Sequence, residues 1–233
     1  MIAHTEYDQG SAEWYEARLG IPTASEFHRI VTPTGKLSAQ SRPYAIRLAT
    51  EKLLNRTLDA IDNLEWVERG RLLEPQAVKA YEFEYDATTE RVAFCTTDDG
   101  RIGASPDRLT ADRRGGVEIK CTAPQTHLAY LIDGPGNDYK PQVQGQMMVA
   151  ELEWVDFFSY SPEMPPVRIR IERDEPYIAT LREALGGFNL LLDIIMAKAK
   201  DAGMYRERRK LLTPASEAYD RSAGPPDWLG LPE

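Results

Sequence analysis

The chain has 233 residues, of which 42% are hydrophobic, and this is enough to bury a sizeable core. Its net charge of −9 argues against a nucleic-acid binder, although a basic groove can coexist with an acidic exterior. No apolar run reaches the roughly 20 residues of a membrane-spanning helix, and the N-terminus lacks the regions of a signal peptide. Cys95 and Cys121 fit no metal-ligand spacing, so we expect buried reduced thiols in a cytosolic protein.

Two short helices are predicted near the N-terminus. Ser11 is suited to cap a helix over residues 12–19, and Gly20 follows it. Thr23 and Glu26 have capping-box spacing for a second helix, which places Ser25 in its first turn. The N–H groups of such a turn, with Arg18 and Ser25, make a candidate phosphate pocket. An ordinary capped helix with a solvated arginine explains the pattern equally well.

The next part of the chain predicts a loop and two helices. Residues 32–41 form a polar loop that is either a DNA contact or a plain surface loop. Residues 42–54 have helical periodicity, with core candidates Ile46, Leu48 and Leu53. Residues 66–85 also have this periodicity, but Pro75 should force a kink or a restart. Glu74 precedes this break, where a glutamate is more often a helix cap than a metal or water ligand.

The centre of the chain predicts a strand meander that carries the chemistry. Strands are expected at 91–97, 101–105 and 117–121, the last two forming a hairpin. A period of two places Glu118 and Lys120 on one face of the last strand, and Asp107, just past the preceding strand, can meet them. Two carboxylates beside a lysine suit metal-dependent phosphodiester hydrolysis. On the motif alone, an exposed ion pair on an edge strand is the commoner explanation.

The second half alternates helices with strands. Helices are predicted at 124–132, 141–152 and 175–199, and strands at 153–160 and 167–172. Three glutamines of the second helix, Gln142, Gln144 and Gln146, could reach phosphate or Lys120, but such a flank is more often solvated. A basic cluster follows the last helix: Lys198, Lys200, Arg206, Arg208, Arg209 and Lys210. A solvated helix end is the favoured explanation of this cluster, with DNA contact second.

Six motifs occur in order along the chain: RLGIPTAS (18–25), RGRLLE (69–74), SPD (105–107), EIKC (118–121), QVQ (142–144) and IERD (171–174). Together they resemble the phage lambda exonuclease family, the YqaJ-type viral recombinases or alkaline exonucleases. This family lies within the PD-(D/E)xK superfamily of restriction-endonuclease-like nucleases. The resemblance runs from about residue 14 to 195. It implies an α/β (α+β) fold with a central mixed sheet flanked by helices. We expect one nuclease domain over residues 1–233, with an irregular proline-rich tail from about 212 to 233.

The resemblance also implies an activity. A protein of this family digests one strand of linear double-stranded DNA from the 5′ end, prefers a 5′-phosphate, and leaves a 3′ overhang for phage recombination. Two Mg²⁺ ions are the expected cofactors, with Mn²⁺ as a substitute. The expected partners are a single-strand annealing recombinase and two further copies of the chain in a ring-shaped homotrimer. The implied location is the cytoplasm of a bacterial host, with a phage or prophage gene.

Residue roles follow from the same resemblance. Asp107 and Glu118 would bind metal with the backbone carbonyl of Ile119, and Lys120 would serve the attacking water. Glu74 would assist the second metal or its water. Four residues match the family's 5′-phosphate contacts, namely Arg18, Ser25, Ser105 and Gln144, while Thr23 matches more weakly and is expected mainly to cap its helix.

Two other functions compete with this interpretation. A restriction-like endonuclease or resolvase on the same core would cut within DNA and need no free end. A non-catalytic subunit that binds DNA ends is the second alternative, and the intact set of Asp107, Glu118 and Lys120 argues against it. The chain departs from the family pattern in loop 32–41, at Pro75 and in the tail. These departures affect the DNA path and the oligomer rather than the chemistry.

Overall fold

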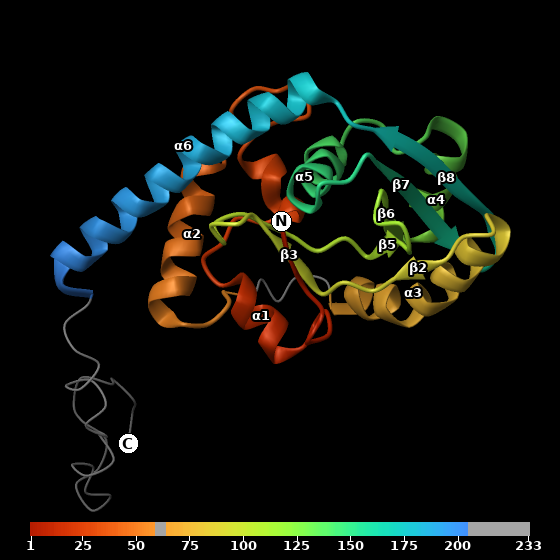
Figure 1. The fold of residues 1–233 in the computed structure, drawn as a ribbon, viewed down its shortest axis with the longest axis horizontal. Coiled ribbons are helices and arrows are strands. Elements are labelled where there is room, and N and C mark those ends of the chain that lie inside the picture. The colour runs from red at the N-terminus through yellow and green to blue at the C-terminus, as the bar shows by residue number, and fades with distance from the viewer. Residues whose placement is uncertain (59–63, 205–233) are drawn as a thin grey trace, which may run out of the picture. The chain divides into compact units, whose positions relative to one another are not determined.

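A computed structural model describes residues 1–58 and 64–204 (Figure 1). The chain divides into two compact units, Met1–Ile195 and Met196–Glu233. The second unit is described only from residue 196 to 204, which includes the short helical segment η2 (Lys200–Met204). The proline-rich tail and four members of the basic cluster, Arg206, Arg208, Arg209 and Lys210, lie outside the described residues. The single-domain organisation therefore stays a prediction.

A five-stranded sheet forms the centre of the first unit. Its strands lie in the order β2 (Thr89–Glu90), β5 (Arg108–Thr110), β6 (Gly115–Lys120), β7 (Trp154–Ser161) and β8 (Met164–Glu172). Strands β6 and β7 are parallel, and every other neighbouring pair is antiparallel. Figure 1 shows β7 and β8 as the two long strands of this sheet. The prediction of a mixed sheet flanked by helices is confirmed.

Helices cover both faces of this sheet. On one face, α3 (Leu64–Glu84) packs its Tyr81 edge-on against Phe158 of β7, with ring centroids 5.2 Å apart. On the other face, α4 (Pro124–Asp133) places Tyr130 5.6 Å from the ring of Phe157, and α5 (Lys140–Ala150) follows it. Because adjacent residues of a strand point to opposite faces, Phe158 packs in the layer with α3 and Phe157 packs in the layer with α4. By the same alternation, Ile119 faces α3, while Glu118 and Lys120 face α4 and α5.

A smaller sheet and the N-terminal helices hold the phosphate-pocket candidates. Its strand order is β1 (Ile2–His4), β3 (Phe94–Thr96) and β4 (Gly103–Ala104). The helices beside it are α1 (Ala12–Arg18), the 3₁₀ helix η1 (Ala24–Arg29), α2 (Ser41–Leu54) and α6 (Glu175–Ala199). The Gly103 N–H donates to the Pro22 carbonyl at 3.0 Å, and Thr23 forms a bridge with Gly103. The turn before η1 is thereby fixed to β4.

The predicted central hairpin is wrong in its pairing. Strand β4 pairs with β3 in the smaller sheet, and the antiparallel partner of β6 is β5, which begins directly after Asp107. Helix α3 continues through Pro75, so of the two predicted outcomes, a kink or a restart, the restart does not occur. Ile46, predicted in the core, is 45% exposed, whereas Tyr44 and Leu48 of the same helix are buried. Across the described ranges, no helix has the length and apolar character needed to span a bilayer.

Candidate active site

Asp107 and the backbone of Ile119 meet at the point where β5 stops pairing with β6. Strand β5 begins with Arg108, which pairs with Val117 of β6. Beyond this pair, the Asp107 carboxylate contacts the edge of β6 where a strand residue would otherwise pair. Its Oδ2 accepts a hydrogen bond from the Ile119 N–H at 2.6 Å. Because the N–H and C=O groups of a strand residue point to the same side, the Ile119 carbonyl faces the side that Asp107 occupies. The structure thus brings these two predicted metal ligands together.

Glu118 is held by side chains on three sides. Lys120 Nζ lies 2.6 Å from Glu118 Oε1, which confirms that the two residues share one face of β6. From α5, Gln142 Nε2 donates to Oε1 at 2.6 Å and Gln146 Nε2 donates to Oε2 at 2.5 Å. Glu118 is only 2% exposed, so these contacts replace the water that an ionised carboxylate would otherwise bind. Tyr139, with its ring 4.9 Å from Lys120 Nζ, completes the surroundings of this pair.

The role of Gln142 and Gln146 was not predicted from the sequence. A solvated flank was the favoured explanation, but Gln146 is 1% exposed and Gln142 is partly buried. The signal lay in their spacing, because residues four apart lie on one helical face and can bind the same partner. Gln144, two residues from each, points elsewhere. Its amide group contacts the backbone of Glu172 and Asp174, between β8 and α6.

The charges of the site are unbalanced in favour of anions. Burial, followed by the charge of Glu118, raises the pKa of Asp107 well above its usual range. Burial opposes the charge of Lys120, but Glu118 and Asp107 outweigh it and raise the pKa of the lysine. Lys120 is therefore an ammonium group that donates hydrogen bonds. Such a site has a deficit of positive charge, which a cation would correct.

Glu74 lies close to these ligands but outside their hydrogen-bonded set. Its charge contributes to the raised pKa of Asp107, as the smallest of the causes. It also lines a separate cavity of about 460 Å³ with Tyr15, Arg71 and Gln9. In residues 1–58 and 64–204, no group of three or more His, Cys, Asp and Glu side chains is gathered closely enough to hold a metal ion. A role for Glu74 toward a second ion stays a prediction.

The donor set nevertheless fits Mg²⁺. This ion is commonly held by one or two carboxylates and completes its octahedron with water and substrate phosphate. Asp107, Glu118 and the Ile119 carbonyl supply hard oxygen atoms of this kind. In addition, Gln146 Oε1 is buried and accepts no hydrogen bond from the described residues. An acceptor left in this way beside a carboxylate suits a bound water or the hydration shell of an ion.

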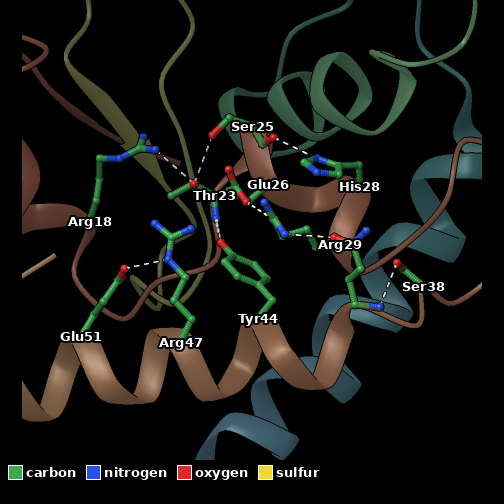
Figure 2. A network of polar contacts seen from close by, with 11 residues as sticks. Arg18, Thr23, Ser25, Glu26, His28, Arg29, Ser38, Tyr44, Arg47 and Glu51 are labelled. Atoms are coloured by element: carbon green, nitrogen blue, oxygen red, sulfur yellow. Dashed lines mark hydrogen bonds and ion pairs between the residues drawn. The ribbon is translucent and has the colours of Figure 1, made fainter. Parts of the chain in front are cut away.

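Four of the predicted phosphate contacts form one cluster around Arg18. The guanidinium donates to Ser105 Oγ at 2.9 Å. It also donates to Thr23 Oγ1 at 3.1 Å, and Thr23 Oγ1 lies 3.4 Å from Ser25 Oγ (Figure 2). Ser105 Oγ also accepts from Trp14 Nε1 at 3.1 Å. Because Ser105 Oγ already accepts two N–H bonds, its own O–H remains able to donate to a ligand.

Glu26 and Glu51 act on the charge of Arg18 from a distance, and among the described residues no carboxylate is bonded to it. Its hydrogen-bond partners are neutral hydroxyl groups, and its guanidinium lies 4.1 Å from the centre of the Trp14 ring. Among the described residues it forms no ion pair. Burial lowers the pKa of Arg18 to about 10, which leaves the side chain charged near neutral pH. A buried cation with neutral partners is stabilised by an incoming anion.

The predicted capping box is wrong, and the structure shows why. Thr23 makes no side-chain cap to η1, because its hydroxyl accepts the bond from Arg18. Glu26, the other member, forms an ion pair with Arg29. Gln144 is also absent from the cluster, since both ends of its amide bind backbone groups elsewhere. Its assignment to the phosphate finds no support in these contacts.

Helix α2 adds a wall to the pocket that the sequence did not indicate. A cavity of about 140 Å³ is lined by Arg18, Thr23 and Ser25 and, from α2, by Tyr44 and Arg47. Tyr44 is buried, and its hydroxyl accepts the Thr23 N–H at 3.4 Å. Figure 2 shows Arg47 extending from α2 toward Thr23. Only the fold reveals this wall, because loop 32–41 separates α2 from the pocket motif.

The sequence matches a family model described as the YqaJ-like viral recombinase domain over residues 13–153. The chain belongs to this family. Among solved structures, it is similar to an alkaline exonuclease, LHK-Exo, from Laribacter hongkongensis. The two share 29% identity with a TM-score of 0.75, over 84% of this chain and 100% of that one. LHK-Exo in complex with dAMP gives 32% identity and a TM-score of 0.74, over 82% and 98% of the two chains.

A third solved structure extends the likeness of fold. It is a phage-related exonuclease from Haemophilus somnus 129PT, with 16% identity, a TM-score of 0.60, and coverage of 76% of this chain and 96% of that one. No curated protein sequence matches the chain. The expected resemblance to YqaJ-type recombinases and alkaline exonucleases is therefore confirmed, and so is the fold class.

Proposed function

We propose that this YqaJ-family protein is a Mg²⁺-dependent exonuclease that digests one strand of linear double-stranded DNA from 5′-phosphorylated ends. The observation that carries the proposal is Arg18, which forms no ion pair among the described residues and lines a cavity joined through Ser105 to the metal-ligand residue Asp107. A nuclease that cuts within a DNA strand has no need of a separate anion pocket beside its metal ligands. Here the Arg18 pocket contacts Ser105, which lies two positions before Asp107. The neighbouring structures of alkaline exonucleases support the same activity.

Each group of residues in the two sites has a separate role. Arg18, Ser25 and Ser105 bind and orient the terminal phosphate through charge-assisted and neutral hydrogen bonds. Asp107, Glu118 and the Ile119 carbonyl hold Mg²⁺, which when bound lowers the pKa of water and stabilises charge on the attacked phosphate. Lys120, an ammonium in these surroundings, orients the attacking water by donating to it and offsets charge on phosphate oxygens. Manganese, with the same preference for oxygen ligands, is expected to substitute.

A digestion assay on end-labelled DNA tests this proposal. We expect Mg²⁺-dependent release of nucleotides from linear duplex with a 5′-phosphate, slower release from a 5′-hydroxyl end, and none from closed circular duplex. The product should carry a 3′ overhang. The Arg18→Ala variant should lose the advantage of phosphorylated ends, a change of about 1.5 to 3 kcal/mol for a bond to a charged group. Cutting of closed circular DNA would favour the restriction-like endonuclease instead.

We further propose that three copies form a ring around DNA, because a closed ring prevents an exonuclease from leaving its track. A trimer would carry about three times the charge of −9, so basic residues must line its channel. Candidates are Lys36, Arg69, Arg71 and the basic cluster from Lys198 to Lys210, which lies mostly outside the described residues. Light scattering should give a trimer mass at micromolar concentration. A monomer that digests long DNA distributively would exclude the ring.

The biological setting follows from the expected product. A 3′ single strand is the substrate of annealing recombinases, so a single-strand annealing protein of the same phage or prophage is the proposed partner. The proposed place of action is the cytoplasm of the bacterial host. Co-purification of the two proteins, and faster annealing of resected than of intact duplex, would be the expected results. An unchanged annealing rate after resection would contradict this pairing.

A further inference from the structure

We propose that Arg47 of α2 is a second cationic arm of the Arg18 pocket, and that it selects a terminal phosphate monoester over an internal phosphodiester. The inference rests on the proposed function, since it names a residue that would set the preference for a 5′-phosphate. It goes further in assigning a role to α2, which carries none of the motifs that define the family resemblance. The ligand is defined by its chemistry, namely a phosphate dianion at the end of a DNA strand.

The contacts of Arg47 orient its guanidinium into the cavity. Its Nε donates to Glu51 Oε1 at 2.9 Å. The same oxygen accepts the Leu58 N–H at 3.2 Å, so the carboxylate is fixed by two donors. Glu51 is 5% exposed, whereas the Arg47 side chain is 39% exposed and lines the cavity with Arg18 and Thr23. Among the hydrogen bonds of the described residues, Arg47 uses only Nε, so its terminal N–H groups are not engaged.

The Arg47–Glu51 pair is poorly explained as a helix stabiliser. Ion pairs four residues apart stabilise a helix best when the acid precedes the base, and here the arginine comes first. Such pairs also lie on solvated faces, where water screens them and each contributes little to stability. This carboxylate is buried instead, and together with Glu26 it lines the cavity that also holds Arg18. A carboxylate in that position holds the Nε edge of the guanidinium and leaves the other edge for a ligand.

The charge of the ligand explains why two arginines are needed. A phosphate monoester has a second pKa of about 6 and is mainly a dianion at neutral pH, whereas an internal phosphodiester carries one charge. Arg18, with neutral partners, matches one charge. Arg47 adds a second guanidinium to the lining of the same cavity, and its planar fork suits two phosphate oxygens. The pocket with both arginines therefore distinguishes a terminal phosphate monoester from an internal phosphodiester by its charge, and the pocket with Arg18 alone should not.

The test compares three variants on duplexes that differ only in the 5′ group. The ratio of kcat/KM for 5′-phosphoryl over 5′-hydroxyl ends should fall about tenfold in Arg47→Ala, which corresponds to about 1.4 kcal/mol. Arg47→Lys keeps the charge without the fork and should retain part of the ratio. The matched control is Arg42→Ala, because Arg42 is an exposed arginine on the same helix and does not line the cavity. Its ratio should equal that of the unchanged protein.

The outcomes separate this inference from the proposed function. Equal rates on both ends in the unchanged protein would overturn both. A ratio that falls in Arg18→Ala but is preserved in Arg47→Ala would overturn the role of Arg47 alone. If the alanine variant unfolds, Arg47→Met keeps the aliphatic stem and removes the guanidinium, and a preserved ratio in that variant would also overturn the proposal.

Discussion

Replacing Asp107 with asparagine should affect stability in opposite directions without and with Mg²⁺. In the metal-free protein the carboxylate is desolvated and lies near Glu118, and these two effects raise its pKa. The Lys120 ammonium, 2.6 Å from Glu118 Oε1, offsets part of the repulsion between the two carboxylates. Asparagine retains an oxygen that can accept the Ile119 N–H. We therefore expect Asp107→Asn to be as stable as the unchanged protein in EDTA, or more stable by up to about 2 kcal/mol.

With Mg²⁺ bound, the unchanged protein should be more stable than the Asp107→Asn variant. An ion at 100 times its Kd stabilises the folded state by about 2.7 kcal/mol, and only the protein with Asp107 should gain this. For a chain of this size the gain corresponds to a rise in Tm of about 5 to 10 °C. Nuclease activity should be lost in Asp107→Asn. Thermal unfolding with EDTA and with Mg²⁺ measures the effect, and Asp138→Asn controls for the removal of one exposed negative charge.

Two results would refute this reasoning. An Asp107→Asn protein that is less stable than the unchanged protein by more than about 1 kcal/mol in EDTA would mean that the carboxylate stabilises the fold, as buried ion pairs do when one partner is removed. A variant that gains as much stability from Mg²⁺ as the unchanged protein would show that Asp107 is not a ligand. The control should gain the full amount.

Three further predictions concern the supports of the two sites. Gln146→Leu removes a donor to the buried carboxylate, so the Mg²⁺ concentration for half-maximal activity should rise about tenfold or more. Asp174→Ala removes the N-cap of α6 and should cost about 1 kcal/mol in urea unfolding at pH 7. Because the bond from Lys140 lowers the pKa of Asp174, this loss should persist at pH 5 and disappear only as the pH falls through that lowered value. Gly145→Ala places a methyl group 2.4 Å from the Phe27 ring and should cost about 1 to 3 kcal/mol, measured in the same way.

Long periodic segments of the sequence predicted their elements well, and short ones did not. The helix 175–199 and the strands 153–160 and 167–172 agree closely with α6, β7 and β8. Strands β4 and β5 have two and three residues, too few for a period to indicate a partner. Which sheet each one joins depends on contacts far away in the chain, such as the bridge from Thr23 to Gly103.

The glutamines of α5 show a second feature that hydrophobic periodicity does not predict. Nine of its eleven residues are buried, because the helix lies between η1 and the sheet. A helix buried on all sides has no polar face to contrast with an apolar one, so periodicity cannot tell which glutamine meets water. The positions of Glu118 and Lys120 were easier to predict, because alternation along a single strand places both side chains on one face, whichever helices cover the sheet.

The segment from Gly103 to Asp107 connects the two sites, and this connection bears on the size of the product. Gly103 is bonded to the turn that supplies Thr23, Ser105 binds Arg18, and Asp107 binds the backbone of β6. One residue, Pro106, separates the phosphate contact Ser105 from the metal-ligand residue Asp107, so the Cα atoms of these two are at most about 7 Å apart. A terminal phosphate held by Arg18 therefore leaves little room between pocket and metal centre. Only the first phosphodiester bond of the strand should reach the reactive atoms, and the chain should release mononucleotides rather than short oligonucleotides. Chromatography of the products of a single turnover measures this, and a majority of dinucleotides would mean that the pocket and the metal centre do not act on the same strand end.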